Sequence, residues 1–156
     1  MKYRIYSKKQ RGFTLIEILV VIGIIGILAT VVLVAVNPNR QFKQARDSQR
    51  VANVNTILNA LGQNMADHQG VLYCSGSVAS LANTPVLMTT APGGFDVADC
   101  LIPDYLPKLP YDPYPDRGYY NNEDDYDTGY TAELDSQGKL TIAASGEIQT
   151  SIEVTR

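Results

Sequence analysis

The chain has 156 residues, of which 45% are hydrophobic and 19% charged, with one histidine and two cysteines. That length suits one domain, or one small domain with an appended segment. The scarcity of histidine and cysteine excludes most familiar zinc sites and leaves almost no material for a histidine-based catalytic triad.

The formal net charge of −3 hides an uneven distribution. Residues 1–12 carry five basic residues and no acid, whereas residues 71–156 carry 13 acids against 4 basic residues. The chain is therefore a basic tip, an apolar stretch and an acidic body. Because neutralising phosphate requires positive charge, no nucleic-acid site is expected on that body.

Residues 13–36 form an apolar run of 24 residues whose only charge is Glu17. As a helix this run spans about 36 Å, enough to cross a hydrocarbon core of roughly 30 Å. It is too long for an ordinary secretory signal, and no A-x-A-like cleavage site follows it. The sequence predicts a single membrane-spanning helix, and the basic residues before and after it favour a cytoplasmic N-terminus by a small margin.

Glu17 has two interpretations on physical grounds alone. An acid in a membrane helix costs free energy, but Glu17 comes only four residues after Phe13 and can stay near the headgroups. It is then a tolerated acid at the helix end. Alternatively, Glu17 awaits a cationic partner once its segment leaves lipid for a protein environment.

The start of the chain resembles a known signal. A basic leader ending in Gly12, followed by Phe13-Thr14-Leu15-Ile16-Glu17 and an apolar helix, is similar to the class III signal of type IV pilins and type II secretion pseudopilins. The resemblance implies that a prepilin peptidase cuts between Gly12 and Phe13 and that the new Phe13 amine is N-methylated. It also implies that Glu17 pairs with the Phe13 amine of a neighbouring subunit.

By this resemblance the chain is expected to be a structural subunit of a type IV pilus-like filament, and not an enzyme. The alternatives are a pseudopilin in a short periplasmic filament of type II secretion or, with less support, a membrane-anchored binding domain that never polymerises. The implied partners are other copies, minor pilins, prepilin peptidase, an inner-membrane assembly platform and, before assembly, membrane lipid. The expected location is the inner membrane, then a cell-surface or periplasmic filament.

Beyond the apolar run, Pro38 should kink or restart the helix. An apolar stripe at helical spacing predicts an amphipathic continuation over residues 37–70 that ends near Asp67. The stripe consists of Val51, Val54, Leu58, Leu61 and Met65, preceded by Phe42 and Ala45. Four cations also lie on this segment, Arg40, Lys43, Arg46 and Arg50. A solvated face is the preferred interpretation for them; contact with lipid headgroups or with acidic neighbours are alternatives.

Residues 71–156 are predicted to form an extracytoplasmic α+β domain. Apolar and polar residues alternate around Tyr130–Leu134, Leu140–Ala144 and, less regularly, Ile148–Val154, with turns between them. This pattern predicts a small antiparallel sheet with one face buried under the preceding helix. The expected fold class is α+β: a long N-terminal helix, half apolar and half amphipathic, packed on a small C-terminal sheet. A long helix laid on such a sheet is also the architecture that the resemblance implies.

Two further features concern bonds within the body. Cys74 and Cys100 would face an oxidising compartment after membrane translocation, which favours a disulfide over two reduced, buried thiols. No cofactor is required, but residues 109–120 resemble part of the major pseudopilin group of type II secretion, which binds calcium in a loop of this region. Asp124, Asp125 and Asp127 are the candidate ligands, because clustered carboxylates suit Ca²⁺. A solvated acidic loop is the alternative.

Overall fold

The computed structural model describes residues 12–156, so the predicted leader, apart from Gly12, lies outside the described residues. The chain divides into two compact units, the first ending at Gln41 and the second comprising Phe42–Arg156. Each unit is considered by itself.

The first unit contains helix α1, Leu15–Val36, and the first residues of helix α2, Pro38–Asp67. Asn37 separates the helices with a left-handed backbone, φ 43°. Its side-chain oxygen accepts a hydrogen bond from the Arg40 amide at 3.3 Å, which satisfies one free amide of the next helix. Pro38 fits the first position of a helix, where no amide hydrogen is needed. The predicted restart at Pro38 is confirmed.

The second unit combines most of α2 with short strands and one further helix. These are β1 (Tyr73–Cys74), β2 (Ser77–Val78), β3 (Val86–Thr89), α3 (Ala98–Leu101), β4 (Tyr119–Asn122), β5 (Asp125–Leu134), β6 (Leu140–Ser145) and β7 (Ser151–Thr155). Strands β1 and β2 form a hairpin, and the main sheet has the order β3-β5-β6-β7 with β4 also paired to β5. All these pairings are antiparallel, and the predicted α+β fold class is confirmed.

The three longest predicted strands form with the expected alternation. Ala132 of β5 lies opposite Ile142 of β6, and Ala144 of β6 lies opposite Ile152 of β7. All four side chains are buried, so this face of the sheet forms core. The prediction that the third strand includes Ile148 is wrong: this residue lies in the turn before β7, and its side chain is 44% exposed.

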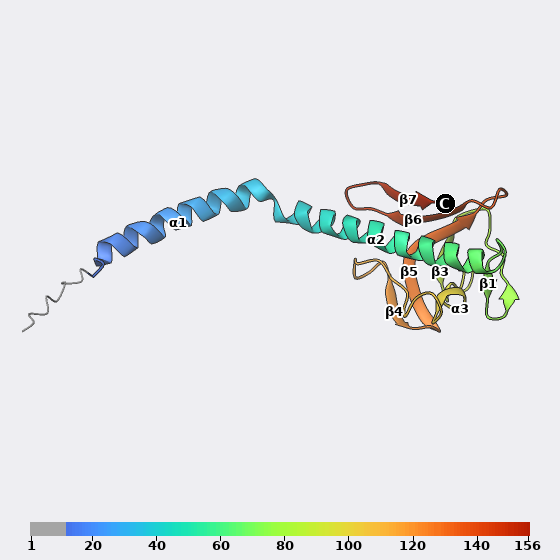
Figure 1. Ribbon diagram of the computed structural model, residues 1–156. Coiled ribbons are helices and arrows are strands. Elements are labelled where there is room, and N and C mark those ends of the chain that lie inside the picture. Colours follow the sequence, from blue (N-terminus) through green and yellow to red (C-terminus); the bar gives the residue numbers. More distant parts are fainter. Residues whose placement is uncertain (1–11) are drawn as a thin grey trace, which may run out of the picture. The chain divides into compact units, whose positions relative to one another are not determined.

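Within the second unit, α2 runs along the sheet (Figure 1) and its inner face joins the same core as β5, β6 and β7. The predicted stripe is confirmed from Val54 to Met65, which packs against the core, and is wrong at its N-terminal end. Val54, Leu58 and Leu61 are buried, whereas Val51 is 39% and Phe42 is 64% exposed. Three polar residues that the predicted apolar stripe does not include are also buried on the inner face of α2: Asp47, Arg50 and Asn64.

Candidate assembly site

Helix α1 begins with a reciprocal hydrogen-bonded cap between Thr14 and Glu17. The backbone amide and hydroxyl of Thr14 both donate to Glu17 Oε2 at 2.7 Å, and the Glu17 amide donates to Thr14 Oγ1 at 3.3 Å. This capping box satisfies two amides that have no partner within the helix. Among the described residues, Oε1 of Glu17 accepts no hydrogen bond, so one carboxylate oxygen remains available to a cation.

Gly12 and Phe13 precede this cap outside the helix, and the Phe13 side chain is 85% exposed. Glu17 lies in the first turn of α1, and Phe13 lies four residues earlier in the sequence, just before the Thr14 cap. The geometry therefore gathers the predicted cleavage junction and the predicted assembly acid at one accessible helix end.

The rest of α1 is apolar and uncovered. Leu15–Ala35 is long and apolar enough to cross a membrane, and none of that window is buried by the residues that the structure describes. Large side chains along it, such as Ile18 and Leu33, are 51% and 66% exposed. The hydroxyl of Thr30 donates to the Gly26 carbonyl at 2.9 Å, so its polar group is satisfied within the helix. Such a surface requires lipid or other apolar helices around it.

A buried ion network joins α2 to two loops of the body. Arg50 is fully buried, and its Nε and Nη2 each donate to Asp112 at 2.7 Å. Its Nη1 donates to Asp47 at 2.7 Å and to Glu147 at 3.1 Å. Arg46 donates from Nε and Nη2 to the two carboxylate oxygens of Glu147, at 2.6 and 2.7 Å. Because forked guanidinium–carboxylate bonds are directional, the network fixes how both loops sit on the helix.

Asp47 also caps the turn between β6 and β7. Its carboxylate accepts from the amides of Glu147, Ile148 and Gln149 at 2.9, 2.8 and 3.2 Å. Burial by itself raises the pKa of Asp47, but these amides and Arg50 outweigh it and lower the pKa to about 2. Hydrogen bonds from Arg46 likewise lower the pKa of Glu147 to about 2, despite desolvation. Both groups are therefore held as carboxylates.

The network corrects the expectation that the four cations on α2 form a solvated face. Arg50 is buried and Arg46 is ion-paired, while Arg40 is exposed and Lys43 is half-buried. A signal was present in the sequence: Arg50 precedes Val54 by four residues and therefore continues the apolar face. Nothing local to the helix identified Asp112 as its partner, because the two residues meet only through tertiary packing.

Cys74 and Cys100 form a disulfide with a Cα–Cα distance of 4.0 Å. It joins β1 to α3 at the end of the body where α2 stops. Asn64 of α2 reinforces the same place, donating to the carbonyls of Tyr73 and Cys100 at 2.7 and 2.8 Å. The helix end, the hairpin and α3 are thus tied together by covalent and hydrogen bonds.

The three predicted calcium ligands lie on and beside β5 without converging. Asp125 accepts hydrogen bonds from the Tyr119 hydroxyl and the Asn121 amide, and Asp127 accepts one from the Gly129 amide. Asp124 lies in the turn that precedes β5. Within residues 12–156 there is no group of three or more carboxylate, imidazole or thiolate ligands arranged to hold a metal. The residues as placed do not fit a calcium site, and calcium binding stays a prediction.

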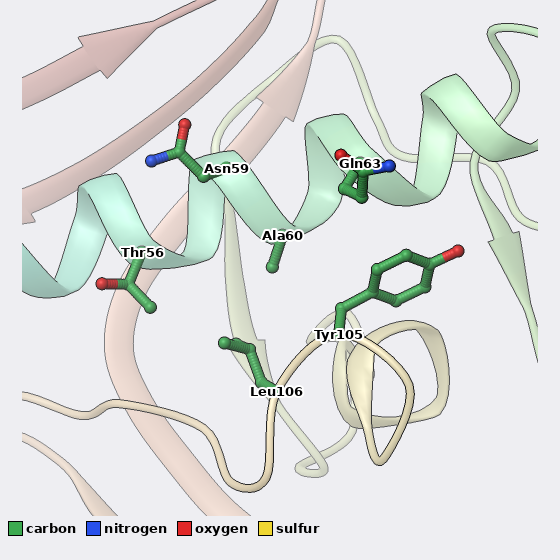
Figure 2. A pocket seen from close by; sticks show the side chains of 6 residues that line it. All are labelled: Thr56, Asn59, Ala60, Gln63, Tyr105 and Leu106. Carbon is green, nitrogen blue, oxygen red and sulfur yellow. The ribbon is translucent and has the colours of Figure 1, made fainter.

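A shallow groove of about 360 Å³ lies between α2 and the loop after α3. Its lining residues are Thr56, Asn59, Ala60, Gln63, Tyr105 and Leu106. Ala60 and Leu106 point toward one another across it (Figure 2). The lining offers amides, hydroxyls and apolar carbons, which suit contact with another surface and not acid–base chemistry.

Comparison with known proteins extends the similarity beyond the signal. Residues 7–33 match the family described as the prokaryotic N-terminal methylation motif. The chain is 30% identical over 149 residues to the Type II secretion system core protein G of Escherichia coli (strain K12), covering 96% of this chain and 92% of that protein. It is 32% identical over 108 residues to the Type II secretion system core protein G of Aeromonas hydrophila, covering 69% and 70%. No solved structure matches the chain.

The similarity to the first relative includes the body as well as the apolar helix, since that alignment spans nearly the whole of both chains. The fold agrees with a structural role: an exposed apolar helix is followed by a small α+β body with its own hydrophobic core. The chain therefore belongs to the family of type IV pilins and type II secretion pseudopilins, as a pilin-like structural subunit.

Proposed function

We propose that a prepilin peptidase cuts the chain between Gly12 and Phe13 and that the processed subunit polymerises through α1 into a pilus-like filament. The observation that carries this proposal is the helix start, where the Glu17 carboxylate lies four residues from Phe13 on an apolar helix that the chain leaves uncovered. Besides capping the helix, an acid in that position can specify a cationic partner.

Cleavage would leave Phe13 with a positively charged amine at the end of α1. Glu17 of one subunit then pairs with the Phe13 amine of its neighbour, using the carboxylate oxygen that the Thr14 cap leaves free. A charge pair inside an apolar helical bundle is costly unless it is matched, so wrong registers are disfavoured. The pair therefore sets the stagger between neighbouring subunits.

Before assembly, α1 lies in the inner membrane with its N-terminus in the cytoplasm and the body outside. An assembly platform in that membrane extracts the subunit, and other copies, together with minor pilins, replace lipid around α1. The filament then projects into the periplasm or to the cell surface. Packing among apolar helices compensates for the loss of lipid contacts.

A secretion pseudopilus is the second candidate, and the two relatives favour it because both are named as core protein G of a type II secretion system. The two filaments differ in where processed subunits are found. Sheared cell-surface material would contain pilus subunits, whereas subunits of a short pseudopilus would remain with the envelope.

The test is intact-mass and N-terminal analysis of the protein from sheared material and from membranes. We expect a chain that starts at N-methylated Phe13. Glu17→Gln should be cleaved normally but yield at least tenfold fewer filaments, because the amine loses its charged partner. Glu123→Gln, the same change on an exposed body residue, is the matched control. An uncut chain in cells with an active prepilin peptidase would refute the proposal.

A further inference from the structure

The four cations that follow α1 on helix α2 fall into two pairs. Arg46 and Arg50 are bound by carboxylates of the body. Arg40 is exposed and Lys43 is half-buried, and neither forms an ion pair with any carboxylate in residues 12–156. Two positive charges at the start of α2 are therefore left without a carboxylate partner in the part of the chain that the structure describes.

These two cations lie close to the end of the membrane span. The apolar window ends at Ala35, five residues before Arg40 and eight before Lys43. At a helical rise of about 1.5 Å per residue, Arg40 and Lys43 follow the end of the window by roughly 8 and 12 Å. A headgroup layer is roughly 5–7 Å thick, and Lys and Arg side chains reach back toward it.

Phe42 gives the same segment an apolar component. Its side chain is 64% exposed and lies outside the core of the body, between the two cations in sequence. Basic side chains next to an exposed aromatic are typical of segments that lie at a membrane surface. Moreover, cations that follow a span on the non-cytoplasmic side run against the usual charge bias of membrane proteins. Their presence requires a local reason.

We propose that Arg40 and Lys43 bind the phosphate groups of anionic phospholipids at the membrane surface that faces the body, with Phe42 seated at the boundary. Two observations support this proposal: the positive charges of Arg40 and Lys43 complement the negative phosphates, and both residues follow the membrane span closely in the sequence. The inference rests on the proposed membrane stage of the subunit. These lipid contacts hold the unassembled subunit at a fixed depth, and they break when it enters a filament.

The test is native mass spectrometry of the full chain in neutral detergent, titrated with dioleoyl phosphatidylglycerol or with dioleoyl phosphatidylcholine. The wild type should prefer phosphatidylglycerol. Since each cation near a membrane surface contributes about fivefold in affinity, Arg40→Gln with Lys43→Gln should lower that preference roughly 25-fold. Lys108→Gln with Lys139→Gln removes the same charge from exposed positions on the body and should leave it unchanged.

Three outcomes would overturn the inference: no preference in the wild type, an unchanged preference in the Arg40/Lys43 variant, or an equal loss in the Lys108/Lys139 control. A filament assay in cells separates this question from the proposed function. If the wild type forms filaments but shows no lipid preference, the lipid site fails and the filament proposal stands. If Arg40 and Lys43 instead pair with acids of a neighbouring copy, the double variant loses filaments while lipid preference is unchanged.

Discussion

Among single residues, Arg50 has the strictest electrostatic requirement, because a fully buried guanidinium is tolerated only while its carboxylates remain in place. The same bonds raise its pKa above the ordinary value, despite desolvation, so the charge persists at every accessible pH. Arg50 also determines which loops pack on α2, since its partners Asp112 and Glu147 come from two loops that are far apart in the sequence.

We predict that Arg50→Met destabilises the body by about 3–5 kcal/mol, because it leaves Asp112 and Asp47 buried without their cation. Urea unfolding of the full chain in detergent, followed by near-ultraviolet circular dichroism of the tyrosines, measures this loss. Arg117→Met is the control: Arg117 is exposed and donates to the Ser145 carbonyl at 3.1 Å. Equal losses in the two variants would show that the network contributes no more than a surface arginine.

Tyr126 supplies a second residue-scale prediction. Its buried hydroxyl donates to Asp96 at 2.8 Å and accepts from the Val97 and Ala98 amides at 2.7 and 3.1 Å. The Ala98 amide also donates to Asp96 at 3.2 Å and keeps that partner, so Tyr126→Phe would leave the buried Val97 amide unsatisfied, at a cost of about 1–3 kcal/mol.

The same urea unfolding measures this loss, and Tyr119→Phe is the matched control. The Tyr119 hydroxyl bonds to Asp125 at an exposed position, where water can replace it, so its removal should change stability by no more than about 0.5 kcal/mol. A Tyr126→Phe protein as stable as the wild type would mean that the Val97 amide finds another partner.

At the scale of elements, the disulfide holds parts that have little regular structure of their own. The β1–β2 hairpin has two residues in each strand, and α3 has four residues. Segments this short are not stable without tertiary support.

We predict that Cys74→Ser with Cys100→Ser lowers stability by roughly 3–4 kcal/mol, as the loop-entropy estimate gives for a separation of 26 residues. Hydrogen exchange should accelerate first in β1, β2 and α3, while the β5–β6 ladder stays protected. Uniform acceleration across the whole body would contradict this local role.

The elements that sequence patterns predicted are those with a sustained period. Helices α1 and α2 and strands β5, β6 and β7 are long enough for apolar spacing to identify them. Strands β3 and β4 and helix α3 contain four residues each and depend on tertiary partners, so no local pattern identifies them. The residues of the assembly site could be predicted because the Gly12–Glu17 signal is contiguous in the sequence. The Arg50–Asp112 ion pair could not be predicted in this way, because its two residues are 62 positions apart.

At the scale of the whole molecule, charge and burial define the pH range over which the body is stable. Asp47 and Glu147 have a pKa of about 2 when folded, against ordinary values of 3.8 and 4.5. The unfolded chain therefore takes up protons first as the pH falls, and stability is lost. On the alkaline side, burial raises the pKa of Tyr130 from 10.0 to about 12. Stability is therefore also lost as the pH rises from 10 toward 12.

We predict a stability plateau between about pH 5 and 10, with an acid limb that Glu147→Gln makes shallower. The wild-type carboxylate contributes fully above pH 4.5 and progressively less toward pH 2, whereas glutamine contributes the same at every pH. Urea unfolding at pH 7, 4 and 3 should therefore place the variant well below the wild type at pH 7 and nearer to it at pH 3. Glu123→Gln, at an exposed position, should follow the wild type throughout. A constant gap between wild type and Glu147→Gln at all three pH values would mean that folding does not lower the pKa of Glu147, and that the acid limb comes from other carboxylates such as Asp47.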